Sequence, residues 1–190
     1  MEKKNLLSLL LLGLFAFTSC KKDTTKNNDT GGVDTGEYGN HPRSTVPASL
    51  AAQWVYGSFS LSSVVNNNGT WSSEYSLTYV LETNGTCREY FQYSSMPSYG
   101  MLIQVRGLRK GTVVVDAANK TIKFYAASGW YDERRNLGSV VRHEYASADL
   151  YPQYFREYSY TETTDGQGRP ALRLVDVKST NTAGLVYTRS

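Results

Sequence analysis

Short runs of alternating apolar and polar residues dominate the chain from about residue 48 onward, and this period of two predicts β-strands. Between residues 73 and 82, Tyr75, Leu77 and Tyr79 share one face of an extended chain. Asn84-Gly85 follows, and this dipeptide is the strongest short signal for a hairpin turn. The pattern therefore predicts a hairpin with its second strand at residues 86–93.

Similar runs predict two further hairpins and a first strand with its turn. They are strands 111–116 and 121–127 around a turn at 117–120, strands 156–163 and 170–178 around a turn at 164–169, and strand 54–64 before an Asn-rich turn at 66–69. Helical spacing is confined to residues 47–52, which predict one turn before the first strand.

Eight or nine short strands joined by local turns describe a meander, and a long meander commonly closes so that no sheet edge is left unpaired. We therefore predict an all-β protein, an antiparallel up-and-down β-barrel of about eight strands, with a β-sandwich as the alternative. The chain has no internal repeat of fixed length, which argues against solenoids and propellers.

The first residues differ from this pattern and predict a secretory signal. Lys3 and Lys4 precede an apolar run at residues 6–17. As a helix this run would be about 18 Å long, well short of the roughly 30 Å hydrocarbon core of a bilayer. Residues 1–19 are therefore expected to direct export and not to span a membrane.

The sequence Phe17-Thr18-Ser19-Cys20 resembles the lipobox of bacterial lipoproteins, and Lys21-Lys22 after it resembles lipoproteins of the Gram-negative outer membrane. This resemblance implies cleavage before Cys20, which would carry a diacylglycerol and an acylated (palmitate-type) amine. Several acyl chains hold a protein on a membrane firmly. Whether the anchored protein faces the periplasm or the cell surface stays open.

Residues 20–47 are predicted to be the acylated cysteine and a flexible tether, because residues 21–45 have almost no apolar content to offset the entropy of ordering. Residues 48–190 are predicted to form the barrel domain. With Cys20 lipidated, Cys87 is left alone, and we interpret it as a small buried strand residue.

The start of this domain resembles bacterial lipocalin-like lipoproteins. The matching residues are Leu50-Ala51-Ala52-Gln53-Trp54, where Ala52 stands in place of the usual Gly, together with Thr83-Asn84-Gly85-Thr86 and Lys110–Val115. The resemblance implies an eight-stranded barrel around a cup, with Trp54 sealing the closed end against a late-strand arginine, Arg173 or Arg189. It would make Trp54 a stability residue and not a binding residue.

Composition excludes several functions. The chain has 20 Lys+Arg and 17 Asp+Glu, a net charge of +3 that is too small and scattered for nucleic-acid binding. His41 and His143 are isolated histidines, the sequence has no His-x-x-His, Cys-x-x-Cys or Glu-x-x-His pairing, and phosphate-loop and nucleophile-elbow motifs are absent. We therefore expect no metal, no cofactor, no catalytic residue and no enzymatic activity. The adjacent charges of residues 132–135 are interpreted as a solvated loop cluster, and a glycan hydrolase is only a minor alternative.

Tyrosine is the unusual component: 14 of the 15 tyrosines lie from Tyr56 onward. Arg156, Tyr158 and Tyr160 share one strand face, and Arg88 and Tyr90 share another. A tyrosine combines a broad apolar ring with a polar hydroxyl, which suits a partly solvated pocket, and a guanidinium can bind an anionic group with two parallel hydrogen bonds. These five residues are the candidate ligand site, although tyrosine stripes also stabilise strand pairing.

Two functional hypotheses remain. The first is a membrane-anchored, lipocalin-like binding module for a small amphiphilic or anionic ligand, which requires a cavity of a few hundred cubic ångströms. The second is a protein-interaction lipoprotein, such as a protease inhibitor or an accessory subunit of an envelope machine. It would act through loops at residues 93–100 and 126–138, with Trp130 and Tyr131 as anchors.

Overall fold

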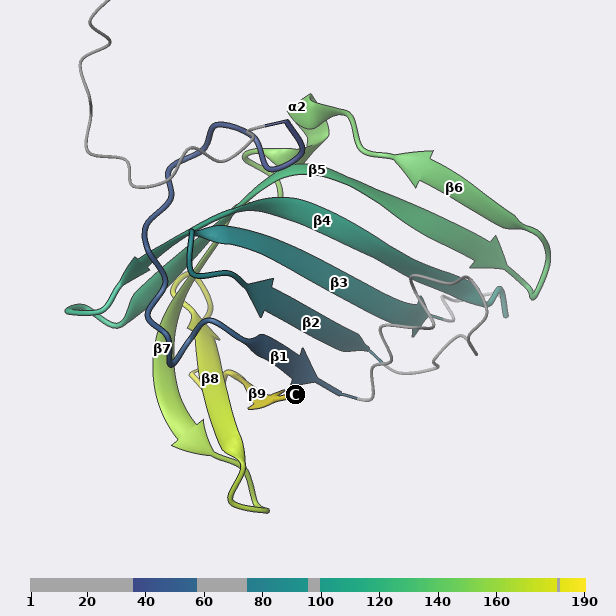
Figure 1. Cartoon of the computed structure of the whole chain (residues 1–190). Helices are drawn as coiled ribbons and strands as arrows, with labels where there is room; N and C mark the ends of the chain where they lie inside the picture. Colours follow the sequence, from purple (N-terminus) through teal and green to yellow (C-terminus); the bar gives the residue numbers. More distant parts are fainter. Residues whose placement is uncertain (1–35, 58–74, 96–99, 181) are drawn as a thin grey trace, which may run out of the picture.

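The computed structural model describes residues 36–57, 75–95, 100–180 and 182–190, and it is built almost entirely of antiparallel strands (Figure 1). The strands are β1 (Gln53–Tyr56), β2 (Ser76–Leu81), β3 (Thr86–Ser95), β4 (Ile103–Asp116), β5 (Thr121–Arg135), β6 (Val140–Glu144), β7 (Arg156–Thr164), β8 (Pro170–Asp176) and β9 (Leu185–Arg189). One short helix, α2 (Ser147–Leu150), connects β6 to β7.

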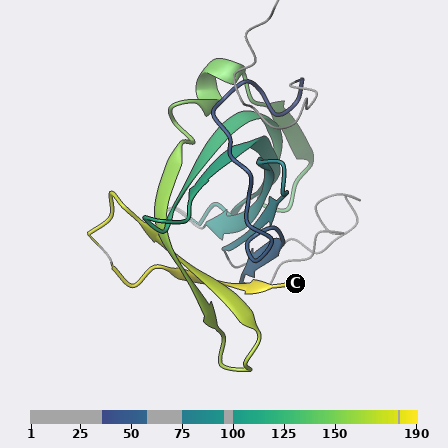
Figure 2. The ribbon, with the colours of Figure 1, turned by 60° about the vertical axis from the view of Figure 1, so that its left-hand side comes forward.

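Eight of these strands close into a barrel, and β6 is an additional strand outside the closed ring. Successive strands pair from β1 to β5, then β5 pairs with β7, and β7, β8 and β9 lead back to β1. Closure is made by Trp54 and Val55 of β1, which lie opposite Arg189 and Thr188 of β9. Figure 2 shows β9 beside β1 at the C-terminus. The prediction of an antiparallel up-and-down barrel is confirmed, and the sandwich alternative is wrong.

The predicted hairpins are present where the described residues cover them. At the first one, Gly85 adopts a φ of 81°, and the side-chain oxygen of Asn84 accepts a hydrogen bond from the Thr86 backbone N–H at 3.0 Å. This conformation favours Gly, because a Cβ in the left-handed region is strained. The turn at residues 66–69 and much of predicted strand 54–64 lie outside the described residues.

The β4–β5 hairpin is much longer than predicted and contains a β-bulge. Gly111 pairs with Ala126 but Lys110 pairs with Ser128, so Ala127 is an extra residue on β5. A Cβ on Gly111 would lie 1.8 Å from the Tyr125 carbonyl oxygen, so only glycine fits this close approach. The bulge reverses the alternation of β5: even-numbered side chains point into the barrel before it, and odd-numbered ones after it.

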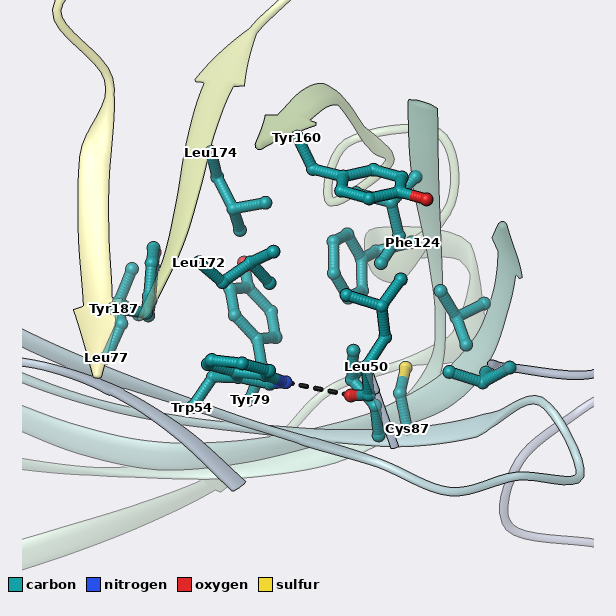
Figure 3. Close-up of a cluster of buried hydrophobic side chains, with 14 of the residues drawn as sticks. Leu50, Trp54, Leu77, Tyr79, Cys87, Phe124, Tyr160, Leu172, Leu174 and Tyr187 are labelled. Carbon is teal, nitrogen blue, oxygen red and sulfur yellow. Dashed lines mark hydrogen bonds between the residues drawn. The ribbon is translucent and has the colours of Figure 1, made fainter. Parts of the chain in front are cut away.

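One half of the barrel interior is filled with side chains from all eight strands of the ring (Figure 3). Trp54 is 2% exposed, and its indole N–H donates to the Leu50 carbonyl oxygen at 2.8 Å. Leu50 belongs to the predicted turn before β1, which is confirmed by hydrogen bonds from the Leu50 and Ala51 amides to the Pro47 carbonyl. The other core members are given by strand: Leu77, Tyr79 and Leu81 of β2, Cys87 and Phe91 of β3, Val105 and Val113 of β4, Ile122 and Phe124 of β5, Tyr160 of β7, Leu172 and Leu174 of β8, and Tyr187 of β9, with Val46 beside them. Leu77, Phe91 and Val105 lie at the boundary of this half and also line the cavity described below.

Part of the predicted tether lies on the barrel. The Thr112 hydroxyl donates to the Pro42 carbonyl at 2.8 Å, the Ser44 amide donates to the Val113 carbonyl at 3.0 Å, and Val46 is only 1% exposed. The imidazole of His41 stacks on Tyr125 at 5.7 Å between ring centroids. The folded part of the chain thus begins before residue 48, because Val46 supplies apolar surface for burial. Residues 1–35, including the predicted signal and Cys20, lie outside the described residues.

Candidate functional site

The other half of the barrel interior holds a cavity of about 510 Å³ that opens to solvent. We call it the cup. Its wall is formed by β2 to β6 and by the α2 connection, on the side where β5 has left β7 and pairs with β6. The lining residues are Tyr75, Leu77, Phe91, Tyr93, Val105, Arg109, Tyr131, Glu133, His143, Glu144, Tyr145, Asp149, Gln153 and Tyr154.

Strand alternation places the lining side chains. Phe91 and Tyr93 are successive inward-facing residues of β3. Val105 and Arg109 also face inward, from β4. Gly107 lies between the latter two, and a Cβ there would come within 2.5 Å of the Phe91 ring. The missing side chain lets this ring approach β4 closely as part of the wall.

Aromatic rings form a continuous lining above this wall. Tyr131 stacks on His143 with 4.7 Å between ring centroids and an interplanar angle of 16°. Tyr145 lies 5.2 Å from Tyr131 and meets Tyr154 edge to face at 5.4 Å. Such offset and edge-to-face pairs are favourable ring geometries, so the lining is pre-organised without a ligand.

The floor of the cup is polar and separates it from the filled half. The Arg109 guanidinium bonds the Glu89 carboxylate at 2.6 Å, and the Tyr79 hydroxyl donates to the same carboxylate at 3.0 Å. The guanidinium also lies 4.3 Å from the ring centroids of both Phe91 and Tyr154. Arg109 is therefore held by one anion and two ring faces.

The ionisation of the floor follows from these contacts. Burial acts to lower the pKa of Arg109, but the charge and hydrogen bond of Glu89 outweigh it, so the pKa is raised and Arg109 stays charged. Burial, followed by the charge of Glu89, raises the pKa of Tyr79 well above its ordinary value. Tyr145 also has a raised pKa, mainly through burial. These phenols are neutral near pH 7.

Carboxylates and one imidazole lie around the mouth. Glu133 faces the cup from β5 and is bonded to Arg135, which is exposed on the same strand. Asp149 lines the cup from α2, and Glu144 lines it from the end of β6. A cavity of this volume with an apolar base and polar tips can hold a small organic molecule of drug-like size.

The candidate residues Arg156, Tyr158 and Tyr160 lie in the barrel but outside the cup lining. The Arg156 guanidinium donates to the carbonyl oxygens of Gln153 and Phe155, both at 2.9 Å, beside a cleft of only about 10 Å³. Tyr158 packs edge to face on Phe124, and Tyr160 is 3% exposed in the filled half. Their role in ligand binding stays a prediction.

The candidates Arg88 and Tyr90 lie on the opposite, outer face of β3. They line a groove of about 390 Å³ between the sheet and residues 37–38, together with Trp130 and Arg142. Arg88 bonds Glu82 at 2.7 Å. The five predicted residues are thus divided between the two faces of one sheet. The two stripes belong to different strands, and the sequence does not show whether two stripes on different strands point to the same face.

The region predicted as loop 126–138 is for the most part strand, and this correction moves several residues. Trp130 and Tyr131 lie within β5, with Tyr131 in the cup and Trp130 in the outer groove. Asp132, interpreted as part of a solvated cluster, is 2% exposed and accepts two hydrogen bonds from Arg142, at 2.7 and 3.0 Å. In the 93–100 region, Tyr93 belongs to β3 and residues 96–99 lie outside the described residues.

Sequence reasoning missed Arg109 and the aromatic lining. A signal for Arg109 was present: Val105, Gly107, Gly111 and Val113 share its parity, so a charged residue stands on the apolar face of β4. Tyr131 carried no such signal, because the bulge at Ala127 changes the parity of β5.

Two other sequence predictions concern structure. Cys87 is a buried strand residue as predicted, and burial raises the pKa of its thiol. Arg189 lies opposite Trp54 in the β1–β9 pairing, whereas Arg173 donates to the carbonyls of Thr182 and Ala183 at 2.7 and 2.8 Å. Arg189 is thus the candidate that neighbours Trp54 in the sheet, and its stacking on the indole stays a prediction.

Within the described ranges, no group of three or more His, Cys, Asp or Glu side chains could hold a metal ion. No helix in the same part of the chain has the length and apolar character needed to cross a bilayer. Comparison of the sequence with protein-family models and curated proteins, and of the fold with solved structures, finds no match.

Proposed function

We propose that the protein is a membrane-anchored, lipocalin-like lipoprotein whose barrel is a non-enzymatic binding module for a small amphiphilic ligand. The observation that carries the proposal is the cup of about 510 Å³ at one end of a closed barrel. Ligand sites commonly enclose 300–1,000 Å³ and combine apolar walls with a few polar groups. Leu77, Phe91 and Val105 supply the walls, and tyrosine hydroxyls supply the polar tips.

The alternative of a protein-interaction lipoprotein has less support. It relied on residues 126–138 as an exposed loop with two aromatic anchors, and these anchors are strand residues on opposite faces of β5. We therefore favour a ligand held inside the barrel.

Native mass spectrometry of the full chain purified from its membrane fraction tests the binding module. We expect a co-purified small molecule that is retained by the native protein and released on unfolding. The matched variants are Tyr131→Ala, which removes part of the cup lining, and Trp130→Ala, which changes the neighbouring residue on the outer face. Loss of the adduct in the first variant only supports the proposal. A protein without an adduct that also binds no amphiphile in a screen would refute it.

Membrane attachment is tested separately at Cys20. Replacement of Cys20 by Ser removes the sulfur to which a diacylglycerol would attach, so the chain should move from the membrane fraction to the soluble fraction. Cys87→Ser serves as the control, because Cys87 is buried inside the barrel. Unchanged partitioning of the Cys20→Ser protein would overturn the lipid anchor and leave the binding proposal standing.

A further inference from the structure

The electrostatics of the cup indicate which charge its ligand carries, and this inference rests on the proposed binding function. Arg109 is the only Lys or Arg among the residues lining the cup in the described part of the chain. Its charge is compensated by Glu89 at 2.6 Å, and its guanidinium lies against the rings of Phe91 and Tyr154. An anionic ligand would therefore have to displace Glu89 in order to pair with Arg109.

The carboxylates of the mouth exceed the cations beside them. Glu133, Glu144 and Asp149 line the cup, and Arg135 is bonded to Glu133. Glu144 also interacts with Arg142, so three carboxylates stand against two guanidiniums and leave a formal charge of −1, while Arg109 and Glu89 cancel. Burial raises the pKa of the Tyr93 phenol, and the negative charge of Glu133 is among the causes that raise it further.

The aromatic lining adds to this preference. Four tyrosines, Tyr75, Tyr93, Tyr131 and Tyr145, line the cup beyond the two rings that hold Arg109. The face of an aromatic ring is electron-rich and attracts cations, most strongly away from bulk water. The Arg109 guanidinium, 4.3 Å from two ring centroids, shows that this cavity already accommodates a cation in this way.

We propose that the ligand of the cup is a cationic amphiphile, a molecule with an apolar or aromatic body and an amine or quaternary ammonium group. The body lies against Leu77, Phe91 and Val105, and the positive group lies among the tyrosine rings and the carboxylates of the mouth.

Three probes that share a benzyl group and differ in the charge of a tetrahedral head test this assignment. They are benzyltrimethylammonium, phenylmethanesulfonamide and phenylmethanesulfonate, with charges of +1, 0 and −1. Calorimetric titration of the full chain at fixed ionic strength should give an ammonium affinity at least about tenfold above that of the sulfonamide, with the sulfonate weakest. Tyr131→Ala should reduce ammonium binding severalfold.

Glu133→Gln should weaken the ammonium probe about threefold to fivefold and leave the sulfonamide unchanged, because only the charged head interacts with the carboxylate. Glu162→Gln is the matched control. It removes the same charge at an exposed position of β7, away from the cup lining.

The outcomes separate the two proposals. Equal or tighter binding of the sulfonamide or sulfonate, lost in Tyr131→Ala, would overturn the cationic ligand and leave the binding function intact. Ammonium binding that is insensitive to Tyr131→Ala would place the probe elsewhere and overturn the assignment. No binding of any probe, together with no co-purified molecule, would overturn both proposals.

Discussion

The two halves of the barrel interior share strands β2 to β5 and are both rich in tyrosine, yet one is filled and the other is hollow. In the filled half, side chains converge from all eight strands of the ring, and Tyr160 and Tyr187 are 3% and 1% exposed. In the cup, β5 has exchanged β7 for β6, so the facing strands β7 to β9 do not line the cavity. Whether a tyrosine stabilises the fold or lines a cavity thus depends on what faces it across the barrel.

The polar floor of the cup marks the boundary between the filled half and the cavity. Tyr79, Glu89 and Arg109 satisfy one another's hydrogen bonds at the level where the two halves meet. A satisfied polar group can be covered by a core on one side and by a wet cavity on the other, whereas an unpaired one would be costly on the covered side. The following predictions test the division, in order of expected effect.

Removal of a large side chain from the filled half should have the greatest effect on stability. Trp54→Ala leaves a cavity where the indole contacts Leu50 and loses a buried hydrogen bond, so we expect the free energy of unfolding to fall by about 3–5 kcal/mol. Urea denaturation followed by circular dichroism measures this change. Trp130→Ala, on the outer face, should cost about 1 kcal/mol or less. Similar losses in the two variants would contradict the division.

Separation of the floor pair should have the next largest effect. Arg109→Met leaves the Glu89 carboxylate without its cation, and Glu89 is 17% exposed, so we expect a loss of about 2–3 kcal/mol. Adding Glu89→Gln removes the unpaired charge and should restore at least half of that loss. Denaturation of the two single variants and the double variant gives the coupling energy. Strictly additive losses would show that the floor is not a coupled unit.

The buried thiol of Cys87 should make the free energy of unfolding depend on pH, which tests the packing of the filled half. Because burial raises its pKa in the folded state, the unfolded chain ionises first, near the ordinary thiol pKa of about 8.5. Stability should be unaffected by this group below that pH and should fall above it, by up to about 1.4 kcal/mol per pH unit. A comparison of wild type with Cys87→Ala between pH 7 and pH 10 isolates the contribution. Equal pH dependence in the two proteins would contradict a buried thiol.

A residue at the mouth of the cup should have the smallest effect on stability. Tyr75 is 51% exposed, so Tyr75→Ala should change the free energy of unfolding by no more than about 0.5 kcal/mol. The same variant should weaken ammonium binding measurably, because its ring lines the cup. Urea denaturation and calorimetry on one preparation measure both quantities. A large loss of stability without a change in affinity would make Tyr75 a structural residue.

The sequence was sufficient for the hairpins, because their determinants are local, and closure followed from the general tendency of a long meander to pair its two edges. Asn84-Gly85 specifies a tight turn, and alternation on either side gives the strands that it joins. The turn before β1 was expected from the helical spacing of residues 47–52, and the burial of Trp54 from the resemblance of residues 50–54 to lipocalin-like lipoproteins and not from a general physical rule.

The cup could not be derived in the same way. Its wall depends on a single extra residue, Ala127, which moves Tyr131 and Glu133 to the inner face and Trp130 to the outer one. It also depends on the choice of partner for β5, a long-range pairing that no short pattern encodes. The surroundings of Arg156 could not be derived either: its guanidinium donates to two backbone carbonyls that no sequence pattern positions, and its role in ligand binding stays a prediction.

The division of β5 between two partners also bears on how such a protein can change over time. Residues 121–124 pair with β7 and close the ring, whereas residues 130–134 pair with β6 on that edge of β5 and with β4 on the other. The inward-facing side chains of the second segment, Tyr131 and Glu133, line the open cup, so substitutions at these two positions are less constrained by packing than those in the filled half. Natural selection can therefore retune ligand preference there, one side chain at a time, while purifying selection on foldability acts on the first segment.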